Sequence, residues 1–515
     1  MSGHVLAVDL GSTGIKVAVV DELARVRAVA GEVIPLLFVD DGGVEQDPRV
    51  WWEALGRCAR RAIVESGLRG HDIGIVAVTS QYTSTTAVDA QGRPLGNTVM
   101  WMDGRGRRHF KPQFTREQMS RWVDVHGMAP HGNCDVGHVH VIRHEWPDAY
   151  DAAVAFVEPM DLLAARLTGH VTATQNTMFP MLSVDNRTWG LTEYSDELLA
   201  MSGMPADKLP QLVPLGQPRG TVTAEAADHL GVSPKAVVTG ATIDSVTSAV
   251  GTGAIDETGC GLIIGTTAVM ATHLPSKRHD IEHGLTTAPS PLPNQWFLVA
   301  ENGIGGKALD VFVNQMVYSN DGLGHAVHEG SYAAVLQAAS EVPCGSNGVL
   351  FLPWLVGSMA PGHDRRMRGG FVNIGIATTR ADMARAVLEG VAMNVAWLLP
   401  YFSALAGRDY GEITFGGGGA ASPLWGQILA DATGVPVRRL AQSNCTNAHG
   451  AALLALYETG ACRLADLPHF LVAAEVHEPN DADHRLLAAR TGSLVDFHDR
   501  NAPFFEAFDS KDHTP

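Results

Sequence analysis

Two short apolar runs, at residues 5–8 and 16–20, open the chain. The turn between them reads Asp-Leu-Gly-Ser-Thr-Gly from Asp9 to Gly14. Apolar runs joined by a short glycine-rich turn predict a β-hairpin. The first element is therefore expected to be a strand, a turn and a second strand.

In the rest of the first half, segments whose apolar residues have helical spacing alternate with segments typical of strands. A helical pattern runs from residue 48 to 66, and apolar runs at 73–79 and 85–89 predict two strands. Residues 159–167 form another helical pattern, which Gly169 is expected to end. This alternation predicts an α/β protein.

The strand-and-turn pattern begins afresh in the middle of the chain. A predicted strand at 236–239 leads into the small-residue turn Gly240 to Asp244, and small residues that suit a tightly packed helix follow. A strand at 261–264 then enters Gly265-Thr266-Thr267, as the first strand enters Gly11-Ser12-Thr13. The second half thus looks like a structural echo of the first, and we place the domain boundary near residues 245–255.

A third glycine cluster, Gly416 to Gly419, lies between a predicted strand at 412–415 and a predicted helix at 423–433. With Ala next in the chain, it matches the G-x-G-x-x-A pattern of dinucleotide-binding proteins. However, the strand predicted at 435–440 ends without the acidic residue that such sites require. No G-x-x-x-x-G-K-[ST] run is present either, which excludes the P-loop class.

Length and composition indicate two hydrophobic cores. The 515 residues exceed the size at which a single core stops growing, and 45% of them are apolar. We predict an N-terminal domain over residues 1–250, a C-terminal domain over 251–480, and a terminal helix with a frayed tail over 481–515.

Charge and hydropathy limit the possible partners and the location. The formal net charge of −18 argues against nucleic acid or an anionic membrane as the main partner. The apolar stretch 386–407 contains Glu389, Asn394 and Pro400, which predicts a buried helix rather than a membrane span. No export signal is visible, and the six cysteines form no C-x-x-C pair, as in proteins with reduced thiols. We therefore expect a cytoplasmic protein.

The glycine-rich turns are candidate phosphate sites. Successive backbone N–H groups in a turn form an anion-binding nest, and two such turns from two domains can hold a polyphosphate from both sides. Asp9, at the end of the first strand, could orient a hydrated Mg²⁺ against those phosphates, or it could merely cap the turn. Lys16 could neutralise phosphate charge, or it could be an ordinary surface lysine.

Asp244 is the candidate catalytic base. It follows a strand and a small-residue turn at the predicted domain boundary. Phosphoryl transfer needs mainly positioning, charge neutralisation and a carboxylate that accepts the hydroxyl proton. The alternative is that Asp244 is only the N-cap of the helix that begins at Ser245.

Two other groups of residues are weaker candidates for a functional site. The one group that resembles metal ligands comprises His131, Cys134, His138 and His140. Its spacing fits no standard zinc pattern, and residues 138 and 140 would point apart on a helix. Trp51, Trp52 and Trp101 could stack on a sugar ring, although adjacent tryptophans usually pack in a core.

Taken together, the motifs resemble those of the FGGY carbohydrate kinases, and specifically the xylulokinase-like branch. The ordered set is Asp9 to Lys16, Glu45 to Pro48 with Trp51 and Trp52, Thr79 to Gln81, Trp101 to Arg105, Leu167 to Gly169, Gly240 to Gly253, Gly265 to Thr267, Gly305 and Gly306, Leu352 to Gly369, and Gly416 to Ala420 with Ser422 and Trp425. Single motifs are weak, but this ordered set spans nearly the whole chain.

The resemblance implies a two-domain fold of the actin/hexokinase/Hsp70 type (ribonuclease H-like) with an inter-domain cleft, and ATP and Mg²⁺ as cofactors. Asp244 would deprotonate the acceptor hydroxyl and Asp9 would position Mg-ATP. The expected nucleotide and phosphate contacts are Gly11, Ser12, Thr13, Lys16, Gly265, Thr266, Thr267, Gly306, Gly418 and Gly419. The expected sugar contacts are Gln81, Tyr82, Trp101, Asp103, Asp244 and Ser245.

Two departures from the branch concern the substrate. Tyr82-Thr83-Ser84 stands where Met-His-Gly usually follows Gln81, and Ser245 stands where an Asn commonly follows the catalytic Asp. Buried hydrogen-bonding groups can reject a wrong hydroxyl pattern strongly. The resemblance implies a ketopentose such as xylulose or ribulose, whereas these changes leave open a different sugar, such as a hexose derivative, or a short polyol.

Two further functions stay open at this stage. The same scaffold could carry a catalytically silent sugar-binding regulator, against which the intact Asp9 and Asp244 argue. An Hsp70-like chaperone is disfavoured because no peptide-binding domain follows the second half. The sequence allows a homodimer but does not fix the oligomeric state.

Overall fold

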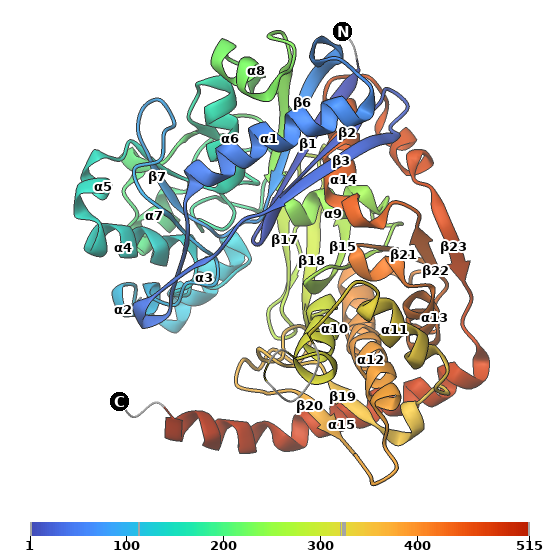
Figure 1. Cartoon of the computed structure of the whole chain (residues 1–515). Helices are drawn as coiled ribbons and strands as arrows, with labels where there is room; N and C mark the ends of the chain where they lie inside the picture. Colours follow the sequence, from blue (N-terminus) through green and yellow to red (C-terminus); the bar gives the residue numbers. More distant parts are fainter. Residues whose placement is uncertain (1–2, 112–113, 320, 322–325, 513–515) are drawn as a thin grey trace.

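Two lobes, each built on a β-sheet, make up the molecule (Figure 1). The computed structural model describes residues 3–111, 114–319, 321 and 326–512. The N-terminal lobe contains a six-stranded sheet and the C-terminal lobe an eight-stranded sheet. The two lobes lie side by side, with the elements drawn from blue to green mainly in one and those drawn from yellow-green to red mainly in the other.

The six-stranded sheet confirms the predicted opening hairpin. Its strands, in spatial order, are β12 (Gly220–Thr221), β13 (Val237–Ile243), β6 (Ile73–Ser80), β1 (His4–Gly11), β2 (Gly14–Val20) and β3 (Val26–Val33). β1 and β2 pair antiparallel with Asp9 opposite Lys16. β1, β6 and β13 run parallel, so their carboxyl ends meet at one edge of the sheet.

Alternate residues of β1 enter two different cores, because successive side chains of a strand point to opposite faces. Leu6 and Val8 pack in the core that includes α1 (Pro48–Ser66). Val5 and Ala7 pack with Leu453 and neighbouring residues of α14 (Thr446–Glu458). A helix from the second half of the sequence therefore covers one face of the first sheet.

The eight-stranded sheet repeats the arrangement of the first. Its strands, in spatial order, are β16 (His279–Asp280), β17 (Leu285–Pro289), β18 (Trp296–Ile304), β15 (Thr267–Leu274), β14 (Gly261–Ile264), β21 (Ile413–Gly416), β22 (Val437–Leu440) and β23 (Ala473–His477). β14 pairs antiparallel with β15 and parallel with β21. This is the pattern of β1 with β2 and β6, and it matches the echo expected from the sequence.

Further strands and helices complete both lobes. In the N-terminal lobe these are β4 (Leu37–Val39), β5 (Gly43–Gln46), β7 (Thr86–Val88), β8 (Thr98–Val99), β9 (Ala155–Val157), β10 (Thr172–Ala173), β11 (Gln211–Leu212), α2 (Gly106–His109), α3 (Arg116–His126), α4 (Asp135–Glu145), α5 (Pro147–Ala152), α6 (Pro159–Thr168), α7 (Asp196–Ser202) and α8 (Ala224–Leu230). In the C-terminal lobe they are β19 (Leu350–Leu352), β20 (Gly370–Val372), α10 (Gly306–Val311), α11 (Ser331–Ser340), α12 (Arg380–Ala406), α13 (Pro423–Thr433) and α15 (Asp481–Asp512).

The helices with clear terminal signals are predicted best. α1 and α13 have the bounds expected from the sequence. Each has a proline at its first residue and a left-handed glycine, Gly67 or Gly434, after its last. Proline is preorganised for the first helical position and glycine tolerates positive φ, so these residues fix both ends.

The prediction of a turn at Gly240 to Asp244 is wrong. β13 continues to Ile243, and its pairing with β6 shifts between Gly240 and Thr242. Ala241, between them, has φ of +47°. The small residues therefore form a bulge inside the strand, which is a common role of glycine in a sheet.

The buried-helix prediction for 386–407 is confirmed within α12. By length and composition alone, α12 is the one helix among the described residues that could cross a membrane. However, 72% of its most apolar window is buried inside the protein. Glu389 also accepts hydrogen bonds from Gly345 and Ser346, so α12 packs as a core helix.

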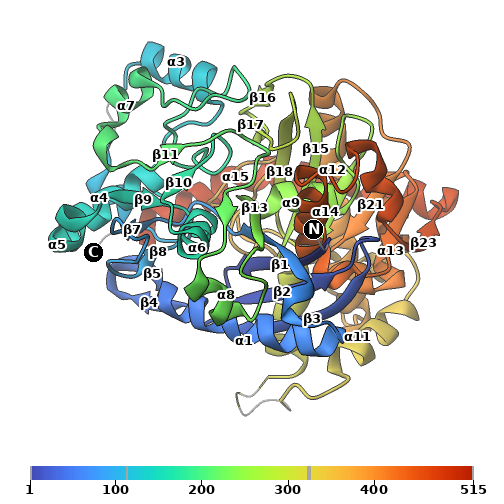
Figure 2. The same cartoon turned by 90° about the horizontal axis from the view of Figure 1, so that it is seen from above.

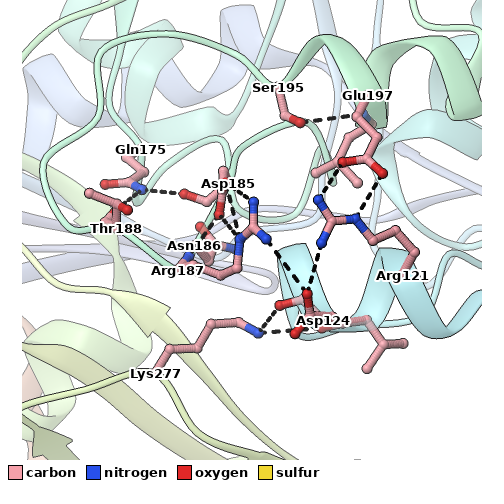
Figure 3. Close-up of polar contacts among 12 residues, drawn as sticks. Arg121, Asp124, Gln175, Asp185, Asn186, Arg187, Thr188, Ser195, Glu197 and Lys277 are labelled. Carbon is pink, nitrogen blue, oxygen red and sulfur yellow. Dashed lines mark hydrogen bonds and ion pairs between the residues drawn. The ribbon is translucent and has the colours of Figure 1, made fainter.

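Contacts in at least two regions of the described chain join the lobes. In the first, α14 crosses α9 (Asp244–Gly251) between the sheets (Figure 2). A Cβ on Gly450 would lie 1.8 Å from the carbonyl oxygen of Thr247, so this crossing requires glycine. In the second, Lys277 of the C-terminal lobe donates to the carbonyl oxygen of Asp124 at 2.7 Å, beside the ion pairs of Arg121 (Figure 3).

Candidate active site

The parallel strands β1, β6 and β13 bring three predicted site residues to one edge. Asp9 lies near the end of β1, Gln81 directly follows β6, and Asp244 directly follows β13. The backbone N–H of Gln81 donates to the carbonyl oxygen of Leu10 at 2.8 Å, which ties the first two strand ends together. Residues far apart in sequence thus meet because parallel strands end at the same edge.

Asp244 is the first residue of α9, not its N-cap. The N-cap is Ile243, and no side chain caps this helix end. The Asp244 carboxylate instead accepts from the Ser245 hydroxyl at 3.3 Å. The alternative that Asp244 only caps a helix is therefore excluded by the geometry.

The charge of Asp9 affects the ionisation of Asp244. Burial raises the pKa of Asp9 to about 6, although Lys16 and a hydrogen bond from Asn447 oppose the shift. Burial and then the charge of Asp9 raise the pKa of Asp244 to about 7. Both side chains keep partial solvent access. Close carboxylates that repel one another are typical of catalytic and cation-binding sites.

The sequence analysis missed two residues at this edge. Glu301 on β18 is exposed, and its charge raises the pKa of Asp244. Asn447 on α14 contacts Asp9 and accepts from the Ser248 hydroxyl at 2.6 Å. Neither belongs to a local motif, so no sequence signal pointed to them.

The acidic pair fits a magnesium ion that is shared with a nucleotide. Mg²⁺ prefers one or two carboxylates plus water and phosphate oxygens. Among the described residues, no group of three or more His, Cys, Asp or Glu side chains could hold a metal alone. Asp9 and Asp244 together carry more negative charge than Lys16 offsets, and a shared cation would neutralise the excess.

The first glycine-rich turn is tied to the predicted sugar side. The Ser12 hydroxyl donates to Gln81 Oε1 and accepts from Trp101 Nε1, both at 2.9 Å. Thr13 stays exposed. Lys16 Nζ donates to the carbonyl oxygen of Asn444 at 2.9 Å, so it bridges the lobes instead of lying free on the surface.

The second glycine-rich turn lies against the start of α10. The backbone N–H of Gly306 donates to the carbonyl oxygen of Gly265 at 2.8 Å, and that of Gly305 donates to Thr266 at 3.0 Å. A Cβ on Gly306 would lie 2.5 Å from the Gly265 oxygen. Gly265 and Thr266 are exposed, and Thr267 is half-buried.

The third glycine cluster meets the second because β14 and β21 are parallel neighbours. Gly417, with φ of +83°, lies so close to Ile264 that a Cβ would approach the Ile264 oxygen to 2.6 Å. Gly418 is exposed and Gly419 half-buried. The predicted nucleotide contacts of the C-terminal lobe therefore converge on one accessible surface.

Tyr82 and Ser245 gather around Asp244. Burial raises the pKa of Tyr82, as do the charges of Glu301 and Asp244, while a hydrogen bond with the Ser245 side chain lowers it. Trp101 is half-buried and donates to Ser12. The two departures from the xylulokinase-like pattern are thus neighbours in space.

Asp103 lies apart from this group. It is fully buried, and one of its carboxylate oxygens accepts from the backbone of Val44 at 2.8 Å. Both of its oxygens also accept from Arg105, which pairs with Glu45 at 2.8 Å. The structure gives Asp103 no free oxygen for a sugar, so the sequence-based expectation is corrected here.

We therefore predict a stability effect for Asp103→Asn. Removing the Asp103 charge leaves the buried Arg105 with Glu45 and Glu145 as its remaining partners, and the loss of one buried partner costs up to about 3 kcal/mol of unfolding free energy. Urea unfolding should show this loss, while the sugar KM of the folded variant stays within about twofold of wild type. A large change in sugar KM without destabilisation would return Asp103 to the sugar site.

The histidine cluster does not form a metal site. Cys134 donates to the carbonyl oxygen of His131, His138 is buried beside Asp135, and His140 stacks on Phe110. Trp51 and Trp52 pack in the core around α1, where Trp51 donates to Gln46 and Trp52 stacks on His229. They do not line the sheet edge at which Asp9 and Asp244 meet.

Comparison with known proteins finds one family along most of the chain. Models of the N-terminal and C-terminal domains of the FGGY family of carbohydrate kinases match residues 4–251 and 260–459. A xylulose kinase of Staphylococcus epidermidis is 27% identical over 491 residues, covering 94% of each chain. A glycerol kinase of Methylibium petroleiphilum is 29% identical and covers 88% of this chain and 90% of its own.

A solved structure confirms the predicted two-domain fold. The ligand-bound xylulose kinase of Lactobacillus acidophilus superposes with a TM-score of 0.85 at 20% identity. The match covers 98% of this chain and 99% of that chain.

Proposed function

This chain belongs to the xylulokinase-like FGGY carbohydrate kinases, which transfer phosphate from ATP to an alcohol group, and we propose that its acceptor is a ketopentose such as xylulose or ribulose. The full-length similarity to xylulose kinases supports this acceptor. The similarity to glycerol kinases keeps a short polyol as the second candidate.

The observation that carries the proposal is the meeting of Asp244 and Asp9 at one sheet edge. We assign Asp244 as the general base and Asp9 as the residue that positions the Mg-nucleotide. Gln81, Tyr82, Trp101 and Ser245 would contact the sugar. The turns at Gly11–Thr13 and Gly265–Thr267, with Gly306, Gly418 and Gly419, would contact the nucleotide.

In the proposed reaction, Asp244 accepts the proton of the sugar hydroxyl as its oxygen attacks the γ-phosphorus. A new oxygen–phosphorus bond forms, and the bond to ADP breaks with its electron pair leaving on ADP. The backbone N–H groups of the glycine turns hold the phosphates in line. Placing the acceptor between two lobes excludes water, which would otherwise take the phosphate.

Magnesium, when bound at Asp9, would neutralise phosphate charge and orient the nucleotide. Lys16 acts from the opposite strand position and lies between Asp9 and the C-terminal lobe. A cytoplasmic location and a homodimeric assembly remain predictions of the sequence.

The pH dependence should reveal the base. Asp244 must be ionised to accept a proton, and its pKa is raised to about 7. The kcat/KM for sugar should therefore fall about tenfold per pH unit below that value and level off above it. Initial rates between pH 5.5 and 8.5, with far-UV circular dichroism as the folding control, check this. A flat profile from pH 6 to 8 would contradict the assignment.

A substrate panel tests the function itself. ADP release from ATP is measured with ketopentoses, ketohexoses, aldonates and short polyols at equal concentration. We expect the highest kcat/KM with a ketopentose. A thermal shift caused by a sugar that is never phosphorylated would instead support a silent sugar-binding protein.

A further inference from the structure

The loop that follows β6 is the part of the proposed sugar site that departs most from the xylulokinase-like pattern. It comprises residues 81–84 and carries Tyr82 towards Asp244 and Ser245. Thr83 has φ of +56°, a left-handed backbone conformation that residues other than glycine rarely adopt. Such a conformation persists only when neighbouring contacts fix it.

Glu158 supplies those contacts. It precedes α6 and is fully buried. One of its carboxyl oxygens accepts from the backbone N–H of Thr83 at 3.1 Å, and the other accepts from the N–H of Ser84 at 3.2 Å. The Ser84 hydroxyl in turn accepts from the N–H of Trp101 at 3.1 Å. One buried side chain thus holds two successive amides of the loop and, through Ser84, reaches Trp101.

A second buried carboxyl group lies behind Glu158. The Oδ1 atom of Asp135 accepts from the Thr85 hydroxyl at 2.9 Å. Apart from Glu158, no described residue donates to its Oδ2 atom. The Asp135 and Glu158 side chains are hydrogen-bonded to each other. Two carboxyl groups can bond in this way only when they share a proton, so a Glu158 O–H donates to Asp135.

The ionisation of the pair follows from this arrangement. Burial and the charge of Asp135 raise the pKa of Glu158 well above its ordinary range. Hydrogen bonds from Glu158 and His138 lower the pKa of Asp135, although burial opposes them. Glu158 can therefore stay protonated and buried without a basic partner, while its two oxygens still accept from the loop.

We propose that Glu158 is a positioning residue for sugar specificity, which fixes loop 81–84 so that Tyr82 and Trp101 face the acceptor sugar. The proposal rests on the proposed kinase function for its kinetic consequences, but the hydrogen bonds that define it are independent of that function. Glu158 touches neither the sugar nor the nucleotide in this account. It acts through the backbone of Thr83 and Ser84.

The experiment compares Glu158→Gln and Glu158→Asp with Asp161→Asn as the matched control. Gln can accept from only one of the two amides, and Asp is one methylene too short to reach both. Asp161 lies in the first turn of α6, which Glu158 precedes, and is equally buried, but it pairs with Arg219 at 3.0 Å and no hydrogen bond joins it to loop 81–84 among the described residues. All three variants weaken an interaction of a buried carboxyl group, but only the two Glu158 variants remove hydrogen bonds to loop 81–84.

We expect both Glu158 variants to raise the sugar KM by about 10- to 100-fold, as the loss of hydrogen bonds to a buried carboxyl group implies. The KM for ATP should stay within about threefold of wild type. Hydrogen-exchange mass spectrometry should show faster exchange in peptides covering residues 81–86. Asp161→Asn should lower the melting temperature without either change.

The positioning role is overturned if the Glu158 variants match Asp161→Asn in sugar KM, or if exchange at 81–86 is unchanged. If the wild-type protein phosphorylates no sugar, the kinase proposal fails by itself, and the exchange measurement still decides the role of Glu158. If the Glu158→Gln variant does not fold, the Glu158→Asp variant, which keeps the carboxyl group, carries the test.

Discussion

Replacement of Asp244 by Asn is expected to lower the kcat for sugar phosphorylation by about 10²- to 10⁴-fold, the range that general base catalysis contributes. Asn keeps the size of the side chain but cannot accept the hydroxyl proton. The kinetics should be measured at pH 8, where the raised pKa of about 7 leaves Asp244 ionised in the wild-type protein. Isothermal titration should show that the variant still binds ATP.

The stability of this variant separates catalysis from folding. A carboxyl group whose pKa is higher in the folded than in the unfolded protein destabilises the fold once it is ionised in both states. Asp244 is such a group above pH 7. Asp244→Asn should therefore melt at the same temperature as wild type or higher at pH 8, while it loses activity.

Glu301→Gln is the control for a negative charge near Asp244. It removes a negative charge that raises the pKa of Asp244 but leaves the base in place. Its kcat should fall less than about tenfold at pH 8, and its pH profile should move to lower pH. If Asp244→Asn keeps more than a tenth of the wild-type kcat, or if Glu301→Gln loses as much, Asp244 is not the base.

Asp9→Asn is expected to have the second largest effect, a fall of about 10²-fold or more in kcat/KM for Mg-ATP. The carboxylate that would orient the cation is lost, and electrostatic stabilisation of the transferring phosphate is usually a large part of catalysis. Because the charge of Asp9 raises the pKa of Asp244, the residual activity should also persist to lower pH. Rates at varied Mg²⁺ and ATP concentrations check both effects.

Asp21→Asn provides the matched control for Asp9. Asp21 follows the same hairpin, but it accepts from the backbone of Leu23 and Arg25, away from the glycine turn. Asp21→Asn should lower the stability of the protein and leave its Mg-ATP kinetics unchanged. Equal Mg-ATP kinetics for Asp9→Asn and Asp21→Asn would remove Asp9 from the nucleotide site.

The sequence predicted the elements that have local signals. Proline and glycine mark both ends of α1 and α13, and apolar alternation with a glycine turn marks the β1–β2 hairpin. Asp9 and Asp244 were recognised because each lies beside a strand end. Parallel pairing of β1, β6 and β13 then places these strand ends together, which the sequence did not show.

What the sequence could not supply are contacts between distant segments. Asp103 belongs to a family motif, but its burial with Arg105 and Glu45 depends on how β5 packs beside β8. Glu158 precedes an ordinary helix, and nothing near it in sequence shows that it holds the loop after β6. The pattern of apolar and polar residues shows which face of a helix or strand is buried. It does not show which other element covers that face.

A crystal structure of the protein with a ketopentose and a non-hydrolysable ATP analogue tests the central claim most directly. We predict the acceptor hydroxyl within about 3 Å of the Asp244 carboxylate. The same oxygen should face the γ-phosphate, which the glycine turns of both lobes hold. A sugar bound outside the inter-lobe edge, or a hydroxyl that points away from Asp244, would contradict the account.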